Sequence, residues 1–274
     1  MNETFSFKRF GTYFKYDITR LWRKHSRAVL LMGLSGVILY VVWVFFGLLF
    51  NQTYCGPALG ARYAVFAIVA LVLELYMTRF YGFITDKKDG SDWILIPASK
   101  AEKFVSMLIN TLIVIPVAFL VVSLCTDWLI CLLDKTVGDP MISGVTSLMA
   151  NMQLDEEDMH IMKELMVSPA SFVALTIVGG FANYLYFLLC GICFKKNKIF
   201  YAILILFGLS TVLSTLSAFI IPSLNLSNLD MEAMNEETLK GIVRGFMITM
   251  YIVTTVIACG LGWGVWHRIS TIKH

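Results

Sequence analysis

The chain has 274 residues, of which 58% are hydrophobic and 15% are charged. Soluble domains are typically about 45–50% apolar and about 25% charged, so this composition excludes an ordinary cytosolic globule. It also excludes a disordered chain, because disorder requires low hydrophobicity. The mean hydropathy of +0.74 instead indicates an integral membrane protein.

Residues 1–27 are predicted to form an amphipathic helix that lies in the membrane interface. On a helical wheel of about 100° per residue, apolar side chains occupy one arc and basic side chains occupy the opposite side. The apolar arc contains Phe7, Phe10, Phe14, Ile18, Leu21 and Trp22. Such a helix places aromatic rings among lipid headgroups and directs its basic residues toward anionic lipid and the cytosol.

Residues 28–274 are predicted to form a domain of six transmembrane helices, because six stretches reach the roughly 20 apolar residues that a bilayer core requires. The expected spans are 28–50, 61–83, 104–126, 172–194, 199–222 and 245–266. The second span is marginal, since Glu74 near its middle costs roughly 3 kcal/mol and its apolar residues barely offset that cost. The expected fold is therefore all-α, with outer loops at 127–171 and 223–244.

Lysine and arginine residues predict the orientation. With both termini in the cytoplasm, 17 of the 22 lie in inner segments and five lie in outer segments, as the positive-inside rule requires. The expected location is therefore a plasma (inner) membrane, which the chain crosses several times. The formal net charge of +3 conceals this asymmetry, and it gives no indication of nucleic-acid binding.

The inner loop between the second and third spans differs from a simple turn. It contains a small apolar group that Pro97 ends: Trp93, Ile94, Leu95 and Ile96. Ser99 then precedes Glu102 by three residues, which is the spacing of a capping box, so a helix is expected to begin there. The apolar group fits a docking site for a partner and fits equally a segment lying on lipid headgroups.

The remaining motifs do not indicate an enzyme. Methionine and acidic residues crowd the long outer loop, and thioethers suit Cu(I); we favour the interpretation that these methionines form the apolar face of short helices. No P-loop of the form G-x-x-x-x-G-K-[ST] and no catalytic motif occurs. No catalytic residue, metal site or cofactor is therefore expected in this chain.

Polar side chains within the spans are candidates for a transport path, because such groups usually face the interior of a bundle. They are Glu74, Asn110, Asn183, Ser210, Ser214 and Ser217. The three serines recur at helical spacing, and they would either line a path or bond to neighbouring helices; the second interpretation is favoured. A kink is expected at Pro116, shortly after Asn110.

The order of these elements resembles the permease subunit of type-2 ABC transporters. Two short segments support the resemblance, Ser6-Phe-Lys-Arg-Phe10 and Ile96-Pro-Ala-Ser-Lys-Ala-Glu-Lys-Phe104. The resemblance implies an elbow helix at 5–24, a coupling element at 86–98, a separate ATPase subunit docked beneath it, and a second permease copy, identical or different. One departure is the outer segment before the fourth span, which is longer and more acidic than the family's pattern.

Two other functions stay open beside an ATP-driven exporter. A membrane scaffold or assembly protein would present its inner loop to a partner and transport nothing. A secondary transporter would use Glu74, although the two halves of the chain show no matched broken helices. The sequence does not indicate a substrate.

Overall fold

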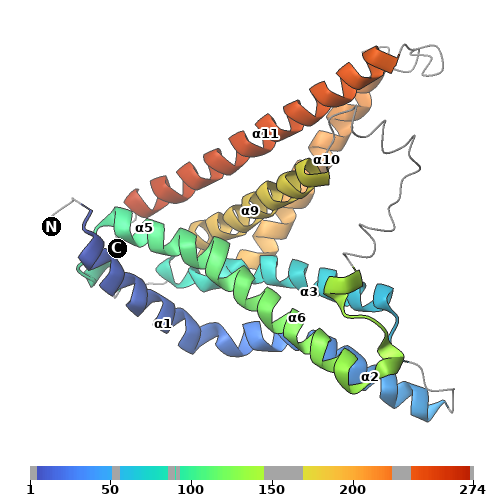
Figure 1. Cartoon of the computed structure of the whole chain (residues 1–274). Helices are drawn as coiled ribbons and strands as arrows, with labels where there is room; N and C mark the ends of the chain where they lie inside the picture. The colour runs from blue at the N-terminus through green and yellow to red at the C-terminus, as the bar shows by residue number, and fades with distance from the viewer. Residues whose placement is uncertain are drawn as a thin grey trace.

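The described part of the chain is entirely helical in its regular structure. The computed structural model describes residues 5–50, 56–85, 90, 93–144, 169–223 and 236–271. Its long helices are α1 (Phe7–Gly33), α2 (Ser35–Leu49), α3 (Leu59–Phe80), α5 (Lys100–Ile109), α6 (Ile115–Leu133), α9 (Pro169–Cys193), α10 (Lys198–Ser223) and α11 (Glu236–Thr271). Figure 1 shows their arrangement.

Five helical segments are long and apolar enough to cross a membrane: Leu59–Thr85, Lys100–Leu133, Ala174–Cys193, Lys198–Leu216 and Arg244–Thr271. The pair α1–α2 supplies a sixth if its two helices, which bend by 43° at the break between them, form one span together. Helices suit this role because a lipid environment requires every backbone polar group to be satisfied within the segment. Over the residues that the structure describes, the chain therefore has the all-α architecture of a multi-pass membrane protein, with five or six helical segments that could cross the bilayer.

Helix α1 extends beyond the expected end of the amphipathic segment. It continues without a break through residue 27 to Gly33, and the bend follows at Leu34. At Gly33 the helix passes so close to α6 that an added Cβ would lie 2.6 Å from the side chain of Val122. Thr126 of α6 also donates a hydrogen bond of 3.2 Å to the Gly33 carbonyl. The absence of a side chain at Gly33 therefore permits this close crossing.

The apolar arc of α1 packs against the protein more than the sequence suggests. We expected the whole arc to lie among lipid headgroups, which is wrong for Leu21: that side chain belongs to the hydrophobic core. Phe10, Phe14 and Ile18 are half-buried, whereas Phe7 and Trp22 are exposed. The reason is that α1 contacts α3, α5 and α6. Part of its apolar arc therefore packs against the bundle, and the rest stays exposed.

The third span is one continuous helical segment with a wide turn inside it. Helix α5 leads into the π-helical turn η2 (Asn110–Val114), which leads into α6. Pro116 has no N–H to donate to the preceding turn, and η2 lies where a kink was expected. The 34 residues of Lys100–Leu133 measure about 51 Å at 1.5 Å per residue. Because a bilayer core is roughly 30 Å thick, both ends project beyond it.

Helix α9 packs between the two halves of the bundle. It contacts α3 on one side and α11 on the other. At the crossing with α3, a Cβ on Gly191 would lie 2.4 Å from the carbonyl oxygen of Thr78, so the two backbones touch. The core is centred here, with Leu73, Met77, Ile84, Leu188 and Ile192 almost fully buried.

The helices diverge from one end of the molecule. In Figure 1, α10 and α11 spread away from α3 and α6 like the arms of a V. The two described ends of the chain meet at the narrow end, where the Ser6 N–H donates to Glu102 and the Lys100 ammonium donates to the Ser270 carbonyl. We call this the terminal end. The apolar faces of α2, α10 and α11 are largely exposed.

Candidate functional site

Three segments that are far apart in the sequence join at the terminal end. They are the first half of α1, the segment 93–99 that follows the second span, and the start of α5. Buried polar contacts connect all three, and we call this region the junction. It contains the apolar group that the sequence singled out, so its geometry tests which of those side chains are accessible to a partner.

Glu102 is the first polar centre of the junction. Its carboxylate accepts hydrogen bonds from Arg9 at 2.6 and 2.8 Å and from the Ser6 N–H at 2.9 Å. The expected capping box is confirmed: the Glu102 N–H donates to Ser99 Oγ at 3.2 Å, and the Ser99 N–H donates to the carboxylate at 2.9 Å. The hydrogen bond from Arg9 is the main reason that the pKa of Glu102 falls to about 2. One fully buried carboxylate thus starts α5 and also holds α1.

Trp93 anchors the segment 93–99 instead of facing a partner. Only 4% of its surface is exposed, and its indole N–H donates to the Tyr13 hydroxyl at 3.1 Å. The Lys103 ammonium donates to the Trp93 carbonyl at 2.8 Å and lies 4.7 Å from the ring centre. Burial lowers the pKa of Lys103 to about 8. Trp93 therefore connects the segment to both α1 and α5.

The other three residues of the predicted coupling group differ sharply in exposure. Ile94 and Ile96 are half-buried, whereas Leu95 is 78% exposed beside the exposed Pro97. Of the four candidates, Leu95 is the one that the structure presents to the surroundings. Residues 86–89, 91 and 92 of the same expected coupling element lie outside the described residues.

Asp17 is the second polar centre of the junction, and the sequence analysis missed it. Its Oδ2 atom accepts hydrogen bonds from Ser106 at 2.6 Å, Tyr81 at 2.8 Å and Asn110 at 3.0 Å. Asp17 is 2% exposed, and burial raises its pKa against the opposing effect of these hydrogen bonds. One carboxylate therefore connects α1 to the end of α3, to α5 and to the wide turn η2. The available signal was a single acid at helical spacing between Tyr13 and Leu21.

A hollow of about 470 Å³ opens on the surface of the junction. It lies between α1 and the segment that follows Leu95. Its lining consists of Ser6, Lys8, Arg9, Thr12, Tyr13 and Tyr16 together with Ile96, Pro97 and Ala98. The junction therefore combines a rigid buried frame with an accessible surface that a partner could contact.

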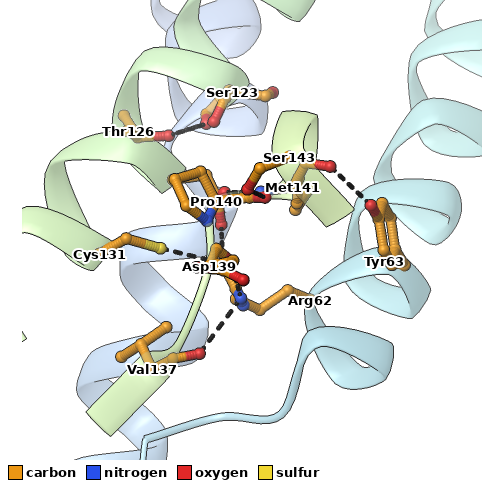
Figure 2. A network of polar contacts seen from close by, with 12 residues as sticks. Arg62, Tyr63, Ser123, Thr126, Cys131, Val137, Asp139, Pro140, Met141 and Ser143 are labelled. Carbon is orange, nitrogen blue, oxygen red and sulfur yellow. Dashed lines mark hydrogen bonds and ion pairs between the residues drawn. The ribbon is translucent and has the colours of Figure 1, made fainter. Parts of the chain in front are cut away.

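A second buried network lies at the opposite end of the bundle, and we call it the Arg62 clasp. Arg62 of α3 bonds to Asp127 of α6 at 2.7 Å, and both side chains are nearly inaccessible. The same guanidinium donates to the carbonyls of Asp139 at 2.7 Å and Val137 at 3.2 Å. The other Asp127 oxygen accepts from the Met141 N–H at 2.7 Å. Figure 2 shows Arg62 reaching toward Val137 and Asp139.

The clasp fixes the chain after α6 onto the bundle. Tyr63, next to Arg62, donates to the Met141 carbonyl at 2.6 Å (Figure 2). Arg62 lies at the start of the expected second span and Asp127 directly after the expected third span, and the sequence analysis did not predict that they pair. The overlooked signal was a pair of opposite charges at the same expected ends of two consecutive spans.

The five predicted pathway residues whose side chains the structure describes do not converge within this single chain. Asn110 joins the Asp17 network, whereas Asn183, Ser210 and Ser214 are exposed. Glu74 is half-buried, and among the described residues it makes neither a hydrogen bond nor an ion pair. The Ser210 hydroxyl donates to the Phe207 carbonyl of its own helix at 2.8 Å. The side chain of Ser217 lies outside the described residues.

Within the described ranges, no group of three or more His, Cys, Asp or Glu side chains could hold a metal ion. The methionine-rich stretch 145–168 lies outside the described residues, so the choice between a copper-binding loop and short helices stays a prediction.

Comparison with known proteins adds no identification. No protein-family model, no curated protein and no solved structure matches the chain. The geometry of the junction and the charge pattern of the sequence are therefore the features that indicate a function.

Proposed function

We propose that the chain is the membrane-spanning permease subunit of an ATP-driven exporter, and that its terminal end faces the cytoplasm. The observation that carries this proposal is the construction of the junction. An exposed apolar residue, Leu95, projects from a short segment that buried contacts hold against both α1 and the start of the third span. Such a segment is suited to transmitting a displacement from a separate subunit to α1 and to the third span.

The contacts of the junction define how a displacement would travel. Trp93 bonds to Tyr13 of α1, and its carbonyl accepts from Lys103 of α5. Glu102 adds a second connection between the same two helices through Arg9. A movement of Leu95 would therefore displace α1 and α5 together, and α5 leads directly into the wide turn η2. π-Helical turns are frequent at functional sites.

The charge pattern supports the cytoplasmic orientation. The terminal end carries the basic residues of α1, and the loop between α9 and α10 adds the exposed Lys195 and Lys196. An excess of lysine and arginine is typical of cytoplasmic segments. In this proposal the protein resides in the plasma (inner) membrane. The exposed apolar faces of α10 and α11 contact lipid or a second permease copy.

The decisive experiment is capture of an ATPase through Leu95. Tagged full-length protein in mild detergent is expected to co-purify with a P-loop ATPase subunit and with ATP hydrolysis. Leu95→Asp places a charge at the docking point and is expected to reduce both by at least about tenfold. Leu133→Asp is the matched control, because Leu133 is 88% exposed at the opposite end of the bundle.

Each result of this experiment is informative. Loss of the ATPase with Leu95→Asp but not with Leu133→Asp supports the proposal. Failure of the unaltered protein to retain any P-loop ATPase counts against it, and so does equal capture by all three proteins.

A non-transporting scaffold is the second candidate, and the dispersal of the predicted pathway residues favours it. A scaffold would retain its partner through Leu95 without creating a path across the membrane. In liposomes, the exporter is expected to couple ATP hydrolysis to movement of a substrate, whereas a scaffold is not. A secondary transporter would instead lose ion-coupled uptake after Glu74→Gln and would need no ATPase.

A further inference from the structure

The face of α1 that points away from the bundle carries two parallel rows of polar side chains. Residues four apart lie on the same side of a helix. The six side chains enclose a shallow hollow of about 530 Å³: Thr12, Tyr16 and Arg20 in one row, and Lys15, Thr19 and Arg23 in the other. The buried residues Tyr13, Asp17 and Leu21 occupy the other side of the helix, so the hollow opens outward.

The hollow is strongly cationic and its charges are available. Three of its six side chains carry a positive charge and none carries a negative charge. Arg20 stacks on the Phe83 ring at 4.1 Å, which fixes the position of its guanidinium. The side chains of Lys15 and Arg23 make no ion pair or hydrogen bond with any residue that the structure describes. Such an arrangement matches an anionic group, since guanidinium and ammonium groups are the usual protein ligands of phosphate.

The position of the hollow along α1 indicates which anion it meets. Arg23 precedes the uncharged apolar run that begins at Ala28 by five residues, or about 8 Å of helix. The headgroup layer on each side of a bilayer core is roughly 5–7 Å thick. Two exposed apolar residues lie near the hollow on α1: Trp22 at the height of Arg23, and Leu31 two turns farther toward the membrane. Arg23 therefore lies at the outer edge of the headgroup layer, and Arg20 and Lys15 line the part of the hollow that is farther from the bilayer core.

We propose that this hollow is a binding site for the headgroup phosphate of an anionic phospholipid in the leaflet at the terminal end. Arg23 and Lys15 bind the phosphate from one row, and the fixed guanidinium of Arg20 binds it from the other. The Tyr16 hydroxyl, which makes no hydrogen bond with the described residues, donates to a headgroup oxygen. This proposal holds for an exporter subunit and for a scaffold alike, because it does not depend on Leu95 or on an ATPase.

Native mass spectrometry of the full-length protein in detergent tests the site. Titration with phosphatidylglycerol is expected to show one retained lipid, and titration with phosphatidylcholine is expected to show none. The double substitution K15Q/R23Q is expected to weaken phosphatidylglycerol binding about 30-fold, since each basic residue near an anionic surface contributes about a factor of five. The matched control is K195Q/K196Q, which removes two exposed charges from the same end outside the hollow, and it is expected to bind as the unaltered protein does.

The remaining outcomes overturn the proposal. Equal weakening by the two double variants would mean that general surface charge attracts the lipid. Inorganic phosphate binding as tightly as the lipid would assign the hollow to a soluble phosphate. A polyglutamate peptide bound through Lys15 and Arg23, without lipid binding, would assign it to an acidic protein. Melting temperatures in lipid-free detergent verify that both variants are folded, and a conservative K15R/R23K variant is expected to retain the lipid.

Discussion

The two ends of the bundle use an arginine–carboxylate pair in different ways. In the Arg62 clasp both partners are nearly inaccessible, with 3% and 4% of their side chains exposed. In the junction the carboxylate of Glu102 is buried, but 32% of the Arg9 side chain is exposed. The clasp closes one end around a fully enclosed pair. The junction keeps one partner at the surface, beside an exposed leucine and an open hollow.

This difference indicates which end of the bundle can rearrange at the lower cost in free energy. Removing one member of an enclosed pair leaves an uncompensated buried charge, so the clasp tolerates little rearrangement. A partly solvated pair exchanges protein contacts for water at lower cost. We therefore expect the clasp end to behave as a fixed point and the junction to be the end that can respond to a partner.

The largest expected effect is at the clasp. Arg62→Leu leaves Asp127 buried without its cation, and we expect the free energy of unfolding to fall by about 3–5 kcal/mol. Denaturant unfolding in detergent measures this change. The double variant Arg62→Leu/Asp127→Leu is expected to recover part of the loss, and a double variant that is less stable than the single one would contradict this interpretation.

An intermediate effect is expected at Asp17. Asp17→Ala leaves Ser106, Tyr81 and Asn110 without their shared acceptor, and an unsatisfied buried polar group costs about 1–3 kcal/mol. The same unfolding measurement detects the change. Asp17→Asn retains a side-chain acceptor and is expected to be milder. If both substitutions were neutral, the Asp17 network would not stabilise the junction.

The smallest effect at neutral pH is expected at the partly exposed Arg9. The pKa of Glu102 lies at about 2 in the folded protein, against an ordinary value of 4.5. The unfolded chain therefore binds this proton first, and the stabilisation is present above about pH 4.5 and lost as the pH falls toward 2. Arg9→Gln is expected to weaken this loss in unfolding measured between pH 6 and pH 2. An unchanged acid profile would exclude Arg9 as the cause of the low pKa.

The sequence predicts much of the fold because its main signals are local. Apolar length identifies the helices, and the spacing of Ser99 and Glu102 correctly predicts a helix start. The first span is not a single straight helix, because α1 and α2 pass as one span only when they are taken together across their 43° bend. The expected orientation, the ATPase and the second copy stay predictions.

The candidate site was harder to predict because its signals are not local. Trp93 and Leu95 belong to one apolar group in the sequence, yet only packing against Tyr13 and Lys103 decides that the tryptophan is buried and the leucine exposed. Asp17 resembles a surface acid until its three donors arrive from other elements. Arg62 and Asp127 are 65 residues apart, and no short-range pattern pairs them.

The wide turn η2 fixes how the two ends of the α5–α6 segment are rotated relative to each other about the helix axis. A turn with bonds from residue i to i+5 holds one residue more than an α-helical turn, and one residue corresponds to about 100° of rotation. Ser106 lies before this turn and Asp127 lies after it, on the same continuous segment. Deleting one of residues 111–113 would leave Ser106, Asn110 and Asp127 in the chain, yet it would turn one end of the segment away from its neighbours. The number of residues in η2 thus sets the rotation about the helix axis between the Asp17 network and the Arg62 clasp.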